Sequence, residues 1–173
     1  MNQQILDRLL KWEGGHSKDP DDPGGETYSG ISRRWNPDWQ GWKFVDAKDA
    51  VTAKFWVTDF YSRKWVEYGM DKLENNVVAE AVFDYAINAG VSNAIKGLQY
   101  ALNRCGRSVS VDCKMGPQTI EAVKRISLKI AEPDLLEWLA VARIERYIDV
   151  IKGNETLAKY RSGWIKRAVS HVG

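Results

Sequence analysis

The apolar residues at the start of the chain recur with the period of an α-helix. Ile5, Leu9 and Glu13 are four positions apart, so they share one face of a helix predicted over residues 3–13. A pair of glycines follows and ends the pattern. Glu13 is therefore expected at the C-terminal end of this helix, on its apolar side.

A turn-rich segment and a short strand pattern come next. Residues 16–25 are dense in Asp, Pro and Gly, which predicts a loop. The segment ETYSGIS, residues 26–32, has the length and the threonine and tyrosine content of a short strand. We therefore expect a small β-hairpin near the N-terminus.

The remaining hydrophobic pattern is helical. Ser92 is expected to act as an N-cap, and Pro117 to open a helix in its first turn. Residues 77–90 are apolar on nearly all faces, which is typical of a helix buried in the middle of a helical domain. The predicted helices span residues 47–65, 77–90, 92–105, 117–130, 133–152 and 156–170. The pattern predicts one mainly α domain over residues 1–173.

Composition excludes two broad classes. The chain has 173 residues, 44% of them hydrophobic and 28% charged, which is typical of a soluble globular protein. No apolar run approaches the roughly 20 residues that cross a bilayer, so no stable membrane insertion is expected. The net charge of +2 is far from the basic balance of a nucleic-acid-binding domain.

The few cysteines and histidines predict neither a disulfide framework nor a metal site. Cys105 and Cys113 are eight positions apart and are interpreted as reduced thiols. They do not form a metal-ligand arrangement with His16 or His171, and no cofactor is expected. The start of the chain lacks the features of a signal peptide, so synthesis in the cytoplasm is expected.

The placement of Glu13 predicts acid–base chemistry. Partial burial and the negative end of the helix dipole both disfavour the carboxylate, so we expect a pKa above its usual value. This is the condition for a general acid near neutral pH. The loop that follows can bring Asp19, Asp21 or Asp22 close as a second carboxylate, as glycoside hydrolysis usually requires. The structural alternatives are a Glu13 salt bridge and an Asp22 that only caps its own turn.

Two motifs resemble a known family. They are EGG at residues 13–15 and DPGGETYSGI at residues 22–31, and the segment VFDYAINAG at residues 82–90 extends the likeness. The chain resembles glycoside hydrolase family 108, N-acetylmuramidases of bacteria and phages with a lysozyme-like fold. Its second part, with VDCKMGPQTIEAV at residues 111–123, resembles a peptidoglycan-binding-type region. The resemblance divides the chain into regions 1–90 and 91–173.

The resemblance implies a lysozyme-like, two-lobed fold and cleavage of the β-1,4 bond between N-acetylmuramic acid and N-acetylglucosamine. Glu13 matches the family's catalytic glutamate, and Asp22 and Thr27 match residues that position or activate water. A lytic transglycosylase is the nearest alternative, and Asp22 and Thr27 favour hydrolysis over it. A wall-binding or secretion-assisting protein that lost its activity is an alternative from another class.

Other side chains are candidates for substrate contacts or for packing. Trp39, like Trp35 and Trp42, is suited either to stacking on sugar rings or to packing its loop. Asp84 and Asn88 share one face of an apolar helix, where they either line a cleft or brace the loop above it. The candidate substrate-binding residues are Tyr28, Trp39, Asp84 and Asn88.

The last helical segment is basic on one side, through Lys159, Arg161, Lys166 and Arg167, with Trp164 opposite. This pattern predicts either a docked C-terminal helix or a helix that disturbs anionic membranes. We expect a monomer whose partner is the glycan strand of peptidoglycan. The expected place of action is the cell wall in the periplasm, reached through a holin if the protein is a phage endolysin.

Overall fold

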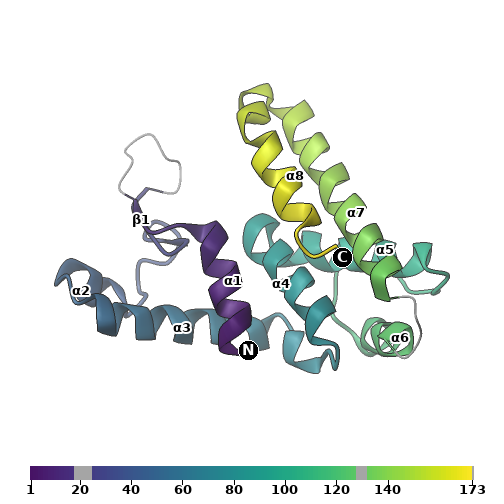
Figure 1. The fold of residues 1–173 in the computed structure, drawn as a ribbon, viewed down its shortest axis with the longest axis horizontal. Helices are drawn as coiled ribbons and strands as arrows, with labels where there is room; N and C mark the ends of the chain where they lie inside the picture. The colour runs from purple at the N-terminus through teal and green to yellow at the C-terminus, as the bar shows by residue number, and fades with distance from the viewer. Residues whose placement is uncertain (18–24, 128–131, 173) are drawn as a thin grey trace. The chain divides into compact units, whose positions relative to one another are not determined.

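The computed structural model describes residues 1–17, 25–127 and 132–172 (Figure 1). It divides into two compact units, Met1–Glu67 and Tyr68–Gly173, which are described here one at a time. Within these residues the chain is mainly helical, with a small antiparallel sheet near the N-terminus. The predicted fold class is confirmed.

The first unit begins with helix α1, Gln3–Glu13. The side chain of Asn2 caps it by accepting a hydrogen bond of 2.9 Å from the backbone N–H of Ile5. The helix buries Ile5, Leu6 and Leu9, and it ends where Gly14 takes a positive φ of 74°. The predicted boundaries and the predicted buried face are both confirmed.

The sheet has three short strands, β1 (His16–Ser17), β2 (Thr27–Tyr28) and β3 (Ile31–Ser32). A small hairpin is confirmed, but the single strand predicted over residues 26–32 is wrong, because a two-residue turn at Ser29-Gly30 divides this segment into β2 and β3. Both turn residues have positive φ, 49° and 79°, as a turn matched to the twist of a hairpin requires. Strand β1 was not predicted, because two residues carry no periodicity and its pairing depends on β2.

Two helices complete the first unit. They are α2, Trp42–Asp46, and α3, Ala50–Glu67. Helix α3 buries a stripe at i, i+4 spacing, which includes Val57, Tyr61 and Trp65. It begins later than the predicted residue 47, and Asp49 accepts a hydrogen bond of 3.1 Å from the N–H of Thr52 in its first turn.

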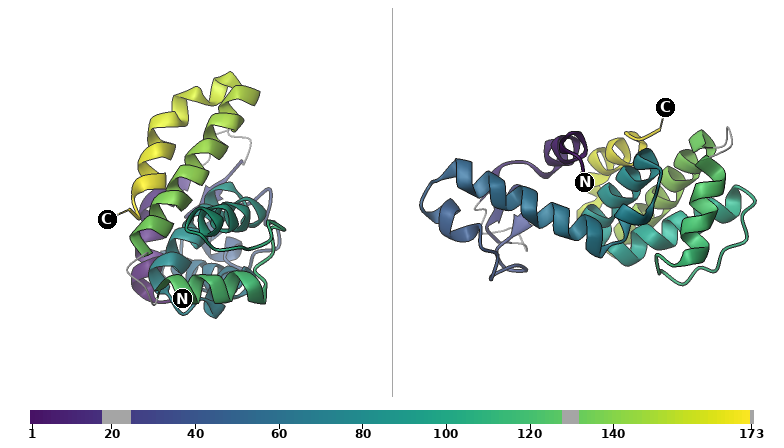
Figure 2. Two further views of the ribbon diagram at one scale, coloured as in Figure 1. Left: turned by 90° about the vertical axis from the view of Figure 1, so that its right-hand side faces the viewer. Right: turned by 90° about the horizontal axis from the view of Figure 1, so that it is seen from below.

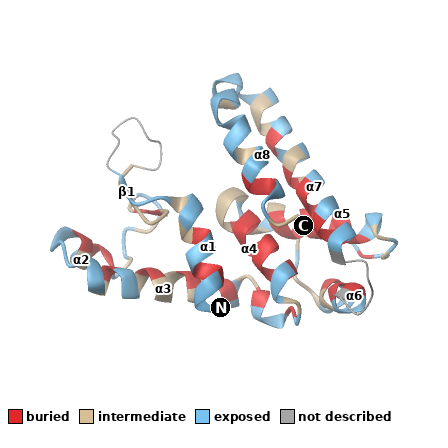
Figure 3. Ribbon diagram, in the orientation of Figure 1, coloured by how far each residue is buried: buried red, intermediate tan, exposed pale blue. Residues whose placement is uncertain are grey.

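The second unit is entirely helical within its described residues. Its elements are η1 (Met70–Lys72), α4 (Asn76–Ala89), α5 (Val91–Arg104), α6 (Pro117–Ser127), α7 (Glu132–Gly153), η2 (Glu155–Tyr160) and α8 (Arg161–Val169). Helix α4 is buried along most of its length, as predicted (Figure 3). Helices α7 and α8 run side by side in every view (Figures 1 and 2).

Three predictions about helix ends have different outcomes. Pro117 does open α6, whose predicted end at residue 130 lies outside the described residues. The Ser92 cap is wrong, because α5 already begins at Val91, directly after Gly90, whose φ of 91° allows the chain to turn there. A single helix over 156–170 is also wrong, because residues 155–160 form a 3-10 helix that begins at the Asn154 side-chain cap.

A buried carboxylate joins three helices of the second unit. Asp84 on α4 is only 3% exposed, and its oxygens accept hydrogen bonds from Arg143 of α7 at 2.7 Å and from Arg167 of α8 at 2.8 and 3.0 Å. Tyr147, also on α7, donates to Asn88 one turn further along α4. Of the two alternatives for the last helix, these contacts confirm the docked one.

The charges around Asp84 determine its protonation. Burial alone would raise the pKa of this carboxyl, but the nearby His171, Arg167 and Arg143 outweigh it and hold the pKa well below its usual value. Asp84 therefore remains ionised in the folded protein, balanced by two buried guanidinium groups. Removing its charge leaves those two cations buried without a partner.

We predict that Asp84→Asn lowers the free energy of unfolding of the second unit by about 3–5 kcal/mol near pH 7. Because the folded pKa lies below the unfolded value near 3.8, the carboxylate stabilises fully above about pH 5 and progressively less below about pH 4. Urea unfolding of parent and variant across this range measures the difference. Asp149→Asn, which removes an exposed carboxylate of α7, is the control and should change little. A constant gap between parent and Asp84→Asn down to pH 2 would contradict the prediction.

Candidate active site

The candidate catalytic residue, Glu13, is the last residue of α1 in the first unit. Its position on the buried face of the helix follows from the same four-residue spacing that buries Ile5 and Leu9. The side chain is half-buried, so it is partly shielded and still open to solvent on one side. A group from a bound substrate can therefore reach it.

The β2–β3 turn lies directly against this carboxylate. A methyl group built at Gly30 would lie 2.5 Å from Glu13 Oε2, 2.8 Å from Glu13 Cβ and 2.8 Å from the hydroxyl oxygen of Tyr61. Only a residue without a side chain fits there, and the φ of 79° also favours glycine. The backbone of the turn thus forms one wall of the Glu13 site.

Two hydrogen bonds hold the turn in this place. The buried hydroxyl of Tyr61, from α3, donates to the carbonyl oxygen of Ser29 at 2.8 Å. The N–H of Ser29 donates at 3.0 Å to the carbonyl oxygen of Gly15, two residues after Glu13. The carboxylate, the turn and α3 are therefore fixed relative to one another, which limits the orientations open to Glu13.

Thr27, the predicted partner of Glu13, lies in β2, two residues before the turn. It is opposite Ser17 on one neighbouring strand and Ser32 on the other, so three hydroxyl side chains share one face of the sheet. Thr27 is half-buried. The predicted second carboxylate, Asp22, and its alternatives at positions 19 and 21 lie outside the described residues.

The opposite face of the sheet is aromatic. The ring of Tyr28 meets His16 edge-on at 5.7 Å between centroids and lies 6.4 Å from Trp39. Trp39 also meets Trp42 at 5.0 Å, and the missing side chain of Gly41 makes room for its indole. Tyr28 and Trp39 are half-buried, which leaves part of each ring open for contact with a sugar.

The other two tryptophans of this segment differ from Trp39. Trp42 is 4% exposed and donates a 2.7 Å hydrogen bond to the carbonyl oxygen of Asn36, so its role is packing. Trp35 is 71% exposed, with the guanidinium of Arg34 5.5 Å from its ring centre. Trp42 therefore belongs to the core of the first unit, whereas Trp35 is an exposed indole.

Sequence reasoning missed an ion-pair network that holds the hairpin. Glu26 contacts His16 Nε2 at 2.8 Å and Arg33 Nε at 2.7 Å, and Arg33 also binds Asp46 of α2 at 2.5 Å. The hydrogen bond to Asp46, aided by Glu26, raises the pKa of the Arg33 guanidinium. The signal was present in the sequence, because the two-residue turn places residues 26 and 33 opposite each other as an opposite-charge cross-strand pair.

The two remaining candidates, Asp84 and Asn88, belong to the second unit. Asp84 makes the buried ion pairs described above, and Asn88 is half-buried beside Tyr147. These are the contacts of bracing residues, but the parts that they brace are helices α7 and α8 and not a loop. The ion pairs explain a carboxylate at position 84 without any substrate.

The described ranges contain no group of three His, Cys, Asp or Glu side chains suited to hold a metal ion. Cys105 and Cys113 are both free thiols, and burial raises the pKa of Cys105. In the same ranges, no helix combines the length and the apolarity that crossing a membrane would require.

Comparison with known families finds a match for the first part of the chain. Residues 6–90 match the family model described as Glycosyl hydrolase 108. The N-terminal part of the chain is therefore similar to glycosyl hydrolase family 108 over these residues. Glu13, the hairpin and Tyr61 all lie inside this glycosyl hydrolase 108 region, and residues 93–169 match a second model, described as a Predicted Peptidoglycan domain. The resemblance stated from the sequence is confirmed.

A solved structure is similar over nearly the whole chain. SagA from Brucella abortus superposes with a TM-score of 0.69 at 27% identity, over 97% of this chain and 89% of that one. No curated protein sequence matches. Together the two family models indicate a glycoside hydrolase that acts on peptidoglycan. The glycosyl hydrolase 108 match extends through α4, although α4 folds with the second unit.

We predict that Gly30→Ala damages both catalysis and stability. The new methyl group would overlap the Glu13 carboxylate, and displacing a catalytic group by about 1 Å can lower the rate about 100-fold. Gly106→Ala is the matched control, because Gly106 has a φ of 75° but open space around it. Wall-clearing assays and thermal unfolding should show a small stability loss for the control, and a larger one plus the activity loss for Gly30→Ala. Equal effects of both substitutions would show that the contact with Glu13 is unimportant.

Proposed function

We propose that the protein is an N-acetylmuramidase that hydrolyses the β-1,4 bond between N-acetylmuramic acid and N-acetylglucosamine, with Glu13 as its general acid. The observation that carries this proposal is the placement of Glu13. A half-buried carboxylate ends a helix, packs against the backbone of the hairpin turn and lies within the glycosyl hydrolase 108 match.

The reaction needs a proton for the leaving oxygen and a nucleophile for the anomeric carbon. In this proposal Glu13 donates the proton to the glycosidic oxygen as the bond to the anomeric carbon breaks. A water molecule then attacks that carbon and loses a proton to a base. Thr27, and Asp22 beyond the described residues, are proposed to position and activate this water.

The first unit also offers aromatic surfaces that suit a sugar chain. The half-exposed rings of Tyr28 and Trp39 belong to the same unit and offer apolar faces on which sugar rings can stack. Residues 93–169, with their match to a peptidoglycan domain, support the wall as the place of action. We propose a monomer acting on glycan strands, since each part of the reaction is assigned to one chain.

A lytic transglycosylase would use the same acid and differ in the nucleophile. The C6 hydroxyl of the muramic acid then attacks in place of water, and the product is an anhydro sugar without a reducing end. The presence of Thr27 in the strand beside the turn favours attack by water.

We predict that Glu13→Gln, which keeps the shape of the side chain and removes the acid, lowers the hydrolysis rate of purified peptidoglycan at least about 100-fold. Mass spectrometry of the soluble products before and after borohydride reduction identifies the new ends. Reducible N-acetylmuramic acid ends from the parent alone are the expected result.

Glu67→Gln is the control, because Glu67 is exposed on α3 and forms a surface ion pair with Lys64. It should digest the wall at the parental rate. Anhydro ends would identify a transglycosylase, and wall binding by the parent without any new ends would leave a binding protein.

A further inference from the structure

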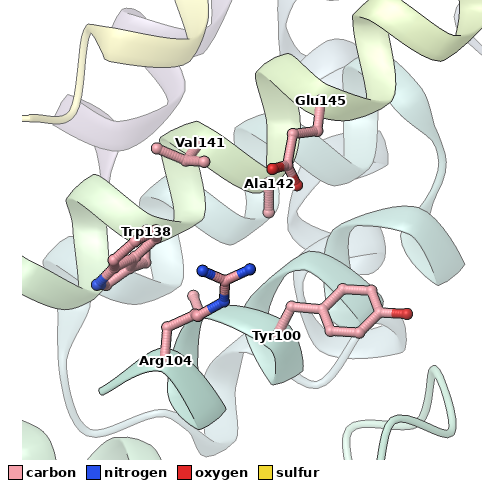
Figure 4. A pocket seen from close by; sticks show the side chains of 7 residues that line it. Tyr100, Arg104, Trp138, Val141, Ala142 and Glu145 are labelled. Atoms are coloured by element: carbon pink, nitrogen blue, oxygen red, sulfur yellow. The ribbon is translucent and has the colours of Figure 1, made fainter.

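A groove between α5 and α7 of the second unit has no role in the function proposed so far. Figure 4 shows its walls, Tyr100 and Arg104 from α5 and Trp138, Val141, Ala142 and Glu145 from α7. The cavity measures about 330 Å³, and a second cavity of about 330 Å³ adjoins it, sharing Tyr100, Ala142 and Glu145. Volumes of this size are typical of small-ligand sites.

The groove exists because small residues line the contact between the two helices. A methyl group at Gly97 would lie 2.9 Å from the ring of Tyr85 and 3.7 Å from the Cβ of Ala142. The helices therefore approach closely along this line, while longer side chains stand on both sides of it. The result is a trough with a narrow floor of small residues.

The trough runs along both helices. Lys96, Tyr100 and Arg104 follow one another at i, i+4 spacing on α5, which spans about 12 Å at 1.5 Å per residue. Arg104 shares its end of the trough with Trp138, whereas Lys96 shares the other end with Asp149, so the two helices run antiparallel. An extended peptide of about four residues has this length.

Several charged side chains that line the trough form no ion pair within the described residues, although Asp149 pairs with Lys152. Arg104 and Glu145 both point into the space between the helices (Figure 4), yet neither they nor Lys96 forms an ion pair with any residue in the described ranges. The two cations instead lie over aromatic rings, Arg104 at 5.0 Å from Trp138 and Lys96 at 5.7 Å from Tyr100. Trp138 is 36% exposed and Tyr100 is 48% exposed, so both rings can still contact a ligand.

We infer that this trough binds the peptide stem of peptidoglycan, an inference that rests on the proposed wall substrate. The stem is a short peptide with free carboxylates and, in many walls, the free amino group of a diamino acid. Arg104 and Lys96 match the carboxylates and Glu145 matches the amino group, with the rings against the aliphatic parts. A bare glycan strand offers mainly neutral hydroxyl and amide groups, which would leave the charges of Arg104, Lys96 and Glu145 without a counterpart.

The test uses the full chain and a synthetic tetrapeptide of L-alanine, γ-linked D-glutamate, diaminopimelate and D-alanine. The peptide is titrated into the protein, and binding is measured by calorimetry and by NMR chemical shifts. The peptide lacks a glycosidic bond, so binding is measured whether or not the protein is a hydrolase. We expect Arg104→Gln and Glu145→Gln each to weaken binding about tenfold. Arg125→Gln, an exposed arginine of α6 in the same unit, is the control and should bind like the parent.

The same titration with the peptide-free disaccharide of N-acetylglucosamine and N-acetylmuramic acid should give no shifts at α5 and α7. The inference is overturned if the parent does not bind the tetrapeptide at millimolar concentration or if all variants bind equally. It is also overturned if the disaccharide binds at the trough as tightly as the peptide. Wall cleavage without tetrapeptide binding would reject the trough alone, and tetrapeptide binding without cleavage would reject only the muramidase.

Discussion

The first unit depends on a close approach between a side chain and a backbone. The Glu13 carboxylate and the hydroxyl of Tyr61 both occupy the space where a side chain of residue 30 would otherwise be. That single missing side chain allows the hairpin turn to meet the end of α1, and the hydrogen bonds through Ser29 then hold it there. The glycine satisfies two demands at once, because its positive φ forms the turn and its lack of Cβ admits the carboxylate.

The sequence predicted what depends on local pattern. The four-residue spacing of Ile5, Leu9 and Glu13 identified both α1 and its buried face, and the all-round apolarity of residues 77–90 identified α4 as a central helix. The predicted helix boundaries were wrong where neighbouring residues overrode a local sequence signal. Ser92 was a plausible cap, but Gly90 already allowed the chain to turn, and the 3-10 segment after Asn154 interrupted a regular helical pattern.

The surroundings of Glu13 in the candidate site could be predicted only in part, because they depend on contacts between distant parts of the chain. Glu13 lies in a short motif, so a single stretch of sequence was enough to select it. The contact of Gly30 with Glu13 joins residues 17 positions apart, and the hydrogen bond from Tyr61 to Ser29 joins residues 32 positions apart. The hydrophobic periodicity of a sequence does not reveal contacts between residues so far apart in the chain. The pairing of Glu26 with Arg33 was more accessible, because a two-residue turn fixes which residues face each other.

The buried charge of the second unit has a consequence for the order of events during synthesis. Asp84 and Arg167 are 83 positions apart, so at about 5–20 residues per second the carboxylate leaves the ribosome roughly 4–17 seconds before its last partner. Until α8 has been made, α4 carries an ionised group in an apolar face with an incomplete set of counterions. The ion pairs of Asp84 can therefore be completed only after the last helix has been made, which makes the final packing around α4 a late event.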